Sequence, residues 1–261
     1  MSSFKNADAG VIVDQLIKTI QKERDYLSEI DGKIGDGDHG INMNKGFTMC
    51  EKKLEGTTYN LSEGLTTLGE TLLEDIGGSM GPLYGMLFDE MAQACEDEEE
   101  ITADVFAEMI TASVEGIQDI SPAQVGDKSL LDTLIPAKEA FVEAKEAGKD
   151  FAECLDAMNA AAEKGWQSTK DLVAKIEQAV LENALEEFLM QEQPAVISSS
   201  QPLEAQQRAC YKNDSYCESN EPLYIHTICL GRTSKFRKEA LGFFHFIGNL
   251  KKVIDKRAKN I

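Results

Sequence analysis

Apolar residues recur every three or four positions through the first two thirds of the chain, which is the spacing of an amphipathic helix. The pattern predicts helices over residues 11–30, 41–54, 63–75 and 82–94, helices that begin after Thr102, Gly126 and Asp150, and a last helix over 169–190. Ser62, Thr102 and Ser168 are expected as N-cap residues, and Pro82 suits a first helical turn. No segment alternates apolar and polar residues as a strand does. We therefore predict an all-α fold, an antiparallel helical bundle or barrel.

The last quarter of the chain differs in composition from the rest. Residues 194–261 hold 11 Lys and Arg against 6 Asp and Glu, whereas the preceding residues hold 15 against 40. Residues 194–222 are rich in Ser, Gln and Asn and lack a helical period, which indicates a linker or disordered segment. An apolar run flanked by Lys and Arg over 234–259 fits one basic amphipathic helix. We predict a helical domain over 5–190 and an atypical tail over 191–261.

Charge and cysteine content exclude several classes of protein. The 26 Lys and Arg against 46 Asp and Glu give a net charge of −20, which disfavours nucleic acid and anionic membranes as partners. No apolar run reaches the roughly 20 residues of a membrane span, and no signal peptide is found. The six cysteines form no CxxC pair, which favours reduced thiols over disulfides or a zinc site. A cytoplasmic protein is the expectation.

The first candidate site is the segment DGKIGDGDHG at 31–40, which lies between two predicted helices. Asp31, Asp36 and Asp38 fall within eight residues, and the glycines among them let the backbone bring their short side chains together. Convergent carboxylate oxygens without thiolates suit Mg²⁺ or Ca²⁺, and a solvated turn is the alternative. The loop is not an EF-hand, because Ile41 takes the sixth position counted from Asp36, where that loop needs glycine.

Helix starts near this loop offer sites for an anion. Residues 41–44 begin a helix whose first backbone N–H groups favour a phosphate. A second glycine-rich loop, GGSMGPLYG at 77–85, is either another phosphate cradle or an ordinary turn between helices. A third loop at 122–132 contains Lys128, which lies near a phosphate or, as is commoner for lysine, is exposed. A metal loop beside a phosphate site is what phosphoryl transfer requires.

The segments DGKIGDGDHGINMNKG at 31–46, GGSMGPLYG at 77–85 and GDKSLLDTLIPA at 126–137 occur in this order. Over about residues 5–176 the chain resembles the nucleotide-binding DhaL subunits of dihydroxyacetone kinases. The resemblance implies a barrel of about eight antiparallel helices that binds ADP or ATP and two Mg²⁺ ions at one end. The implied metal ligands are Asp31, Asp36 and Asp38. The implied nucleotide-binding residues are His39, Gly40, Ile41, Asn42, Gly78, Ser79, Met80, Ser121 and Leu130.

Several positions depart from the family pattern. Met80 stands where many members have a hydroxyl side chain, and Ser121 replaces a glycine. His39 stands where related fatty-acid kinases have threonine, which favours the ketose-kinase branch. After Ile176, relatives continue into a segment rich in Gly, Arg and Ser and then an Asp-x-Gly-Ala turn, which close over the nucleotide. Codons for this segment can be chosen so that one base added before Glu177 restores both features at the family spacing, so the tail is predicted to be a frameshift product.

The resemblance implies a function. The chain would be the nucleotide-binding subunit of a dihydroxyacetone (glycerone) or related ketose kinase, and a separate K subunit would hold the substrate. The phosphate donor would be ATP, or a phosphocarrier subunit of a phosphotransferase system that rephosphorylates bound ADP. No residue of the chain is assigned as a catalytic base. The alternatives are a DhaL-like regulator that signals nucleotide state to a transcription factor and an inactive, frameshifted remnant.

Overall fold

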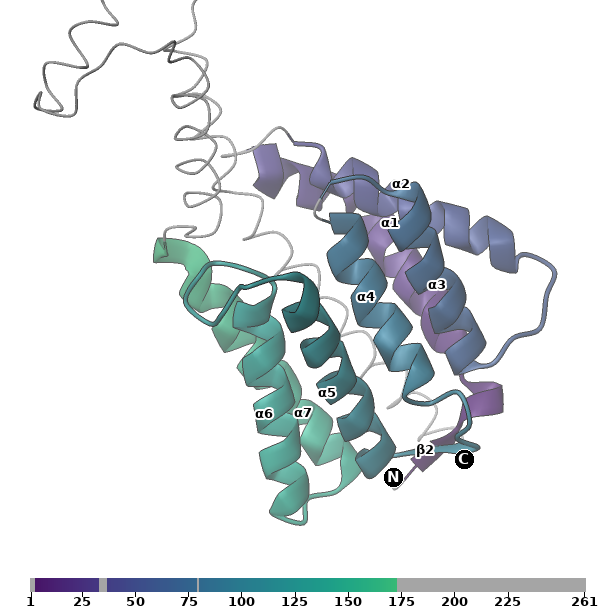
Figure 1. Cartoon of the computed structure of the whole chain (residues 1–261), viewed down its shortest axis with the longest axis vertical. Coiled ribbons are helices and arrows are strands. Elements are labelled where there is room, and N and C mark those ends of the chain that lie inside the picture. Colours follow the sequence, from purple (N-terminus) through teal and green to yellow (C-terminus); the bar gives the residue numbers. More distant parts are fainter. Residues whose placement is uncertain (1–2, 33–36, 79, 173–261) are drawn as a thin grey trace, which may run out of the picture.

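A computed structural model describes residues 3–32, 37–78 and 80–172 of the chain (Figure 1). In chain order, their elements are β1 (Ser3–Lys5), the 3₁₀ turn η1 (Asn6–Asp8), α1 (Val11–Gly32), α2 (His39–Leu54), α3 (Leu61–Asp75), α4 (Met80–Gln93), β2 (Glu100–Thr102), α5 (Ala103–Ile120), α6 (Leu131–Glu146), α7 (Phe151–Ser168) and the 3₁₀ turn η2 (Thr169–Asp171). Helices make up most of these residues, so the predicted all-α fold is confirmed.

Each helix packs against the next one along the chain, from α1 and α2 through to α6 and α7. The connections therefore alternate between two ends of the bundle (Figure 1). The α1–α2, α3–α4 and α5–α6 connections and the end of α7 lie at one end, which we call the glycine-loop end. The two strands and the connections α2–α3, α4–α5 and α6–α7 lie at the other, which we call the strand end. Residues far apart in sequence thus meet at each end.

Apolar side chains from all seven described helices form one continuous core. At the strand end, the ring of Phe106 lies 5.1 Å from that of Phe141 and 5.6 Å from that of Phe151, measured between centroids. Phe4 of β1 stacks on Phe151 at 6.0 Å. Full burial of one such side chain stabilises a fold by about 1.5–3 kcal/mol. The cluster therefore joins α5, α6, α7 and the N-terminal strand.

Three of the helix starts that the structure describes have a side-chain cap. Thr102 accepts a hydrogen bond from the Val105 backbone N–H, as predicted for the start of α5. The predicted cap at Ser62 is wrong, because Asn60 caps α3 and forms a reciprocal capping box with Glu63. Asp150 forms the same arrangement at the start of α7. Asn60 is the better cap because its carboxamide oxygen reaches the third amide of the helix.

Two predictions about secondary structure need correction. β1 and β2 form an antiparallel pair in which Phe4 lies opposite Ile101, although no strand was predicted. Three residues are too few to show an alternating pattern. Ser168 does not cap a helix, because it is the last residue of α7 and its hydroxyl donates to the Gly165 carbonyl. The rest of the predicted helix at 169–190, the boundary at residue 190 and the tail lie outside the described residues, apart from η2.

Candidate functional site

The first predicted site lies where α1 ends and α2 begins, at the glycine-loop end. Asp31 is completely buried near the end of α1, and its Oδ2 atom accepts a hydrogen bond of 2.8 Å from the His39 backbone N–H. His39 is the first residue of α2. A carboxylate next to the first amides of a helix is stabilised by hydrogen bonding and by the helix dipole. The hydrogen bond from His39 to Asp31 thus joins the end of α1 to the start of α2.

Asp38 is also hydrogen-bonded to a residue of α2. Its Oδ2 atom accepts a hydrogen bond of 2.9 Å from the side-chain amide of Asn42, one turn further along. Gly37, just before it, has a φ of +77°, a left-handed conformation that favours glycine. His39 is 1% exposed. The structure therefore places Asp31, Asp38, His39 and Asn42 around one helix start.

Gly40 shows how closely the two helices approach at this loop. A Cβ atom on Gly40 would overlap the carbonyl oxygen of Arg24 and lie 2.6 Å from Ser28 Oγ, both on α1. Gly40 is therefore packed against α1. Ile41, the next residue, is 50% exposed on the outside of α2. Of the predicted nucleotide-binding residues on α2, His39 and Asn42 thus face the cavity described next, whereas Gly40 and Ile41 do not line it.

The second glycine-rich loop joins α3 to α4 at the same end. Gly78 has a φ of +78°. A Cβ atom on Gly77 would meet nothing within 4 Å, whereas one on Gly81 would overlap the Ile76 carbonyl oxygen. Met80, the first residue of α4, is 2% exposed. The loop thus turns tightly into α4 and leaves the space above Gly77 clear.

The two loops share a cavity of about 140 Å³ lined by Asp38, His39, Asn42, Gly77, Gly78 and Met80. It lies between the first turns of α2 and α4, where backbone N–H groups without intrahelical partners favour an anion. Its volume is below the roughly 300–1,000 Å³ of cavities that enclose a drug-sized ligand. It therefore suits the phosphate end of a nucleotide better than a whole nucleotide. Gly77 is the lining residue that the sequence-based list omitted.

The described side chains near this cavity fit Mg²⁺. Asp38 lines the phosphate-sized space, and Asp31 accepts from the backbone of His39, which also lines it. Carboxylate oxygen is the ligand that Mg²⁺ prefers. Within residues 3–32, 37–78 and 80–172, no three His, Cys, Asp or Glu side chains are grouped closely enough to hold a metal. Asp36, the third predicted ligand, and Ser79 lie outside those residues.

The third loop, between α5 and α6, is organised by Asp132. The Asp132 carboxylate accepts hydrogen bonds from the backbone N–H groups of Gly126, at 2.6 Å, and Ser129, at 2.7 Å. Lys128 is 6% exposed, so the expectation of an exposed lysine is wrong. Ser121 and Leu130, predicted to bind nucleotide, lie on this loop and do not line the cavity of 140 Å³. The Ser121 hydroxyl accepts from Ala123 N–H, and Leu130 is buried.

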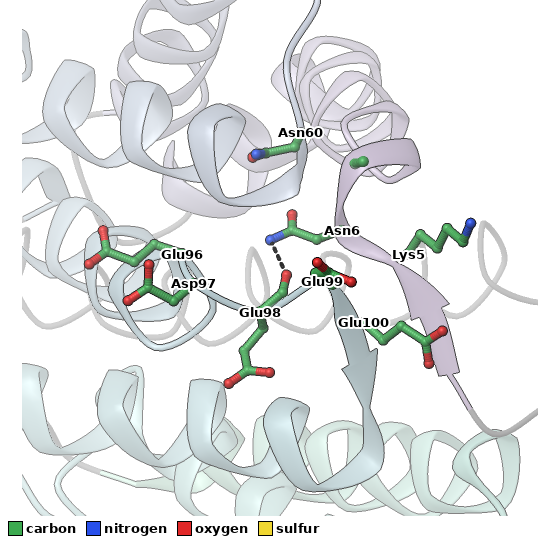
Figure 2. Close-up of a pocket in the computed structure, with 9 residues that line it drawn as sticks. Lys5, Asn6, Asn60, Glu96, Asp97, Glu98, Glu99 and Glu100 are labelled. Atoms are coloured by element: carbon green, nitrogen blue, oxygen red, sulfur yellow. Dashed lines mark hydrogen bonds between the residues drawn. The ribbon is translucent and has the colours of Figure 1, made fainter.

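A larger cavity of about 420 Å³ lies at the strand end (Figure 2). It is lined by Lys5, Asn6, Ala7, Asn60 and the acidic run 96–100. The carboxylates of Glu96, Glu98 and Glu100 point to different sides (Figure 2). Asn6 is buried, donates to the Cys95 and Glu98 carbonyls and accepts from Leu61 and Ser62. The Asn6 side chain thus joins the connection after α4 to the start of α3 through their backbone groups.

Two further sequence expectations can be compared with the structure. Cys50, Cys95 and Cys154 are free and buried thiols, and burial raises the pKa of Cys50 and of Cys95 to about 12. They are therefore protonated and unreactive in the folded protein. None of the helices in the described part of the chain is long and apolar enough to cross a membrane.

The DAK2 domain family matches residues 33–187. A Listeria innocua protein named PEP-dependent dihydroxyacetone kinase 2, ADP-binding subunit DhaL, is 35% identical over 170 residues, covering 64% of this chain and 78% of that protein. The ADP-binding subunit DhaL of the Escherichia coli PEP-dependent dihydroxyacetone kinase is 33% identical over 154 residues, 59% of this chain and 73% of that one. In Lactococcus lactis, the corresponding subunit of a PTS-dependent kinase is 43% identical over 114 residues, 43% and 57% of the two chains.

The crystal structure of the dihydroxyacetone kinase from C. freundii in complex with AMP-PNP and Mg²⁺ is also similar. Its TM-score is 0.56 at 17% sequence identity, and the match covers 97% of this chain and 35% of that one. At this identity the likeness shows the fold alone. The chain corresponds to about a third of the length of that kinase.

Proposed function

Because this chain belongs to the DAK2 domain family, we propose that it is the ADP-binding subunit of a kinase that phosphorylates dihydroxyacetone or a related ketose. The observation that carries the proposal is the cavity between the first turns of α2 and α4. Asp38, His39 and Asn42 line one side of it, and Gly77, Gly78 and Met80 line the other.

The phosphates of the nucleotide would occupy this cavity. Two helix N-termini meet there, and each presents backbone N–H groups to an anion. Gly77 and Gly78 carry no side chains that would keep a phosphate away from the backbone. Asn42 and the buried His39 supply polar side-chain groups on the opposite side. The arrangement positions a polyphosphate without any covalent chemistry by the protein.

Asp31, Asp36 and Asp38 would hold Mg²⁺, for which we propose two ions. Bound Mg²⁺ would neutralise the negative charge of the phosphates. Asp31 and Asp38 contribute by being oriented in advance, since both are bonded to the first turn of α2. A buried carboxylate fixed in this way loses little conformational entropy when its ligand binds.

The acceptor and the donor of the phosphoryl group would both be supplied by other subunits. We assign no catalytic base to this chain, so the ketose hydroxyl would be held and activated on a separate K subunit. The relatives are named ADP-binding subunits of PEP-dependent or PTS-dependent kinases. We therefore propose that ADP stays bound and is rephosphorylated by a phosphocarrier subunit of a phosphotransferase system.

The direct test measures binding of ADP and Mg²⁺ to the isolated chain. At 100 times the dissociation constant, a ligand stabilises the folded state by about 2.7 kcal/mol, equivalent to a rise in Tm of roughly 5–10 °C. We expect Asp38→Asn to remove this rise and to weaken binding in calorimetry by about 100-fold or more, because it deletes a charge opposite the metal. Its Tm without ligand should stay close to that of the unaltered chain.

Glu98→Gln is the matched control, since it removes the same charge at the strand end, on the rim of the larger cavity. It should bind ADP and Mg²⁺ as the unaltered chain does. Equal affinity of the unaltered chain and Asp38→Asn would contradict the proposed site. No binding by the unaltered chain would favour the inactive remnant.

A further inference from the structure

The two sides of the phosphate-sized cavity are formed by segments that are far apart in the sequence. One side is the start of α2, and the other is the glycine-rich loop that leads into α4. The width of the cavity therefore depends on how the starts of these two helices are held relative to each other. The end of α3 packs against both helices (Figure 1).

Gly46 is the point at which α2 meets the end of α3. It is buried and lies one turn beyond Asn42, which lines the cavity. A Cβ atom on Gly46 would lie 2.5 Å from Leu72 Cδ2 and 2.9 Å from Ile76 Cγ1, closer than side-chain carbons normally approach. Leu72 and Ile76 are themselves buried, so neither has free space to move into. Glycine at position 46 therefore lets α2 lie this close to α3.

The same two residues of α3 contact α4 through their backbone. A Cβ atom on Gly81, the second residue of α4, would overlap the Ile76 carbonyl oxygen and lie 2.7 Å from that of Leu72. Ile76 also directly precedes Gly77, which lines the cavity. Packed interiors transmit small displacements. A side chain at position 46 that displaced Ile76 would thus move one side of the cavity relative to the other.

Polar contacts on the surface join the same two helices. Lys45, next to Gly46, donates a hydrogen bond of 3.3 Å from Nζ to the backbone carbonyl of Asp75. Lys53, further along α2, forms an ion pair of 3.2 Å with the Asp75 carboxylate. Asp75 is the last residue of α3. The end of α3 is therefore bonded to α2 beside the buried contact.

We propose that Gly46 is a positioning residue for the phosphates of the nucleotide, because its contact with Leu72 and Ile76 sets the separation of the two sides of the cavity. Gly46 does not line the cavity itself. It acts through Ile76, which holds the glycine-rich loop at a fixed distance from the start of α2. This inference rests on the proposed function.

Gly46→Ala tests the proposal by adding one methyl group to the contact. We expect the dissociation constant for ADP with Mg²⁺ to rise about tenfold, which is the effect of losing one hydrogen bond to a charged group. Calorimetry well below the unfolding transition measures this change in a folded protein.

Leu72→Val is the compensating change, because it shortens the side chain that lies nearest to the added methyl group. In the double variant Gly46→Ala/Leu72→Val, one carbon is gained on α2 and one is lost on α3, so the total side-chain volume is conserved. Changes that conserve volume are tolerated best, and ADP affinity should return to within about threefold of that of the unaltered chain. A loss of affinity caused by general damage to the fold would not be restored by a second core substitution.

Gly64→Ala is the matched control. Gly64 is a buried glycine of α3 at the strand end, where a Cβ atom would lie 3.0 Å from side-chain atoms of Tyr59 and Val13. Urea denaturation should show a loss of stability in both Gly46→Ala and Gly64→Ala. Only Gly46→Ala should bind ADP more weakly.

Lys45→Met tests the same junction without crowding it. Removal of its hydrogen bond to Asp75 should weaken ADP binding about threefold, in the range of exposed polar contacts. Lys52→Met is its control, since Lys52 is an exposed lysine of the same helix. It should bind ADP as the unaltered chain does.

Unaltered ADP affinity in Gly46→Ala, or equal losses in Gly46→Ala and Gly64→Ala, would overturn the proposal. So would a failure of Leu72→Val to restore binding. If Gly46→Ala does not fold, the two lysine variants decide, and equal ADP affinities of Lys45→Met and Lys52→Met would overturn it. If the unaltered chain binds no ADP, the proposed function fails, and the role of Gly46 with it. If the unaltered chain binds ADP and Gly46→Ala binds it equally well, the positioning role alone fails.

Discussion

The two ends of the bundle both combine acidic residues with a cavity, but in opposite ways. At the strand end, the carboxylates of the run 96–100 are exposed and surround about 420 Å³. At the glycine-loop end, the cavity is only about 140 Å³, and Asp31 and Asp38 are each bonded to the first turn of α2. Cavity volume and the number of acidic residues would favour the strand end as the functional site. The acidic groups beside the cavity at the glycine-loop end have a fixed orientation. Binding and catalysis depend on such fixed orientation, so the glycine-loop end is favoured as the functional site.

The two ends differ in how their carboxylates are accommodated in the folded protein. An exposed carboxylate keeps its hydration, so the strand end can carry several at little cost. A buried one such as Asp31 must be compensated by hydrogen bonds from the protein. The glycine-loop end provides them through a helix start that only a close approach of α1 and α2 can place there. The glycine-loop end keeps a buried carboxylate although its burial is unfavourable. We take this as a sign that the glycine-loop end is the functional one.

The largest effect is expected from Gly40→Ala, which tests the close approach at the glycine-loop end. Alanine normally stabilises a helical position relative to glycine by up to about 1 kcal/mol. Here the added Cβ atom would overlap the Arg24 carbonyl oxygen, so α1 and α2 must separate. We expect the free energy of unfolding to fall by about 3 kcal/mol, measured by urea denaturation.

Gly77→Ala provides the comparison within the same end, because its Cβ atom would meet no atom within 4 Å. Its free energy of unfolding should change by less than about 1 kcal/mol. Equal stability of Gly40→Ala and the unaltered chain would show that the α1–α2 contact tolerates a methyl group. The argument for a fixed Asp31 would then fail.

A smaller loss is expected from Asn6→Ala, which tests whether the strand end is structural. Asn6 bonds the start of α3 and the connection after α4 through its side chain. Its removal leaves buried backbone groups without these partners, and we expect a loss of roughly 2 kcal/mol in the free energy of unfolding. Calorimetry with ADP and Mg²⁺ should give an unchanged affinity.

Asn6→Asp sharpens that test, since it keeps the acceptor for Leu61 and Ser62 and loses the donor to the two carbonyls. At pH 7 its stability should fall at least as far as that of Asn6→Ala, because a buried carboxylate oxygen would then face the Cys95 and Glu98 carbonyl oxygens. A marked loss of ADP affinity in either Asn6 variant, measured below its unfolding transition, would mean that the strand end takes part in binding.

The sequence predicted the features that depend on local spacing. Apolar periodicity identified the helices, and the loop between two of them indicated that the aspartates at 31–38 lie next to a helix start. Thr102 was correctly predicted as a cap because the threonine and the third amide after it lie in the same turn. Such features need only a few consecutive residues, so a single sequence reveals them.

Features that join distant segments were not predictable in this way. The pairing of β1 with β2 brings together residues almost 100 positions apart. Lys128 is buried because its partner is the carbonyl of Leu172, which local sequence does not indicate. No role for Asp132 was predicted from the sequence, yet it organises the third loop. Each depends on the assembled bundle, where tertiary contacts override local preference.

The smallest effect is expected from Glu90→Gln, a change between the two ends. Burial, followed by the nearby carboxylates of Asp89, Asp119 and Glu115, raises the pKa of Glu90 above its usual value of 4.5. The folded state therefore holds a proton that the unfolded state releases, so this group lowers stability as pH rises from about 4.5 through its folded-state pKa. No backbone amide is found bonded to it among the described contacts, in contrast to Asp31.

Glu90→Gln should therefore stabilise the protein at pH 7 by about 0.5 kcal/mol and leave it unchanged at pH 4, where both states carry a neutral side chain. Urea denaturation at the two pH values measures the difference between the variant and the unaltered chain, which cancels the titration of other groups. Glu108→Gln, an exposed change on α5, serves as the control and should show no such gain. A destabilised Glu90→Gln at pH 7 would mean that the Glu90 carboxylate receives a stabilising contact. Carboxylates that are shielded from solvent and stabilised by a contact would then not be confined to the glycine-loop end, and this feature would no longer distinguish the functional end.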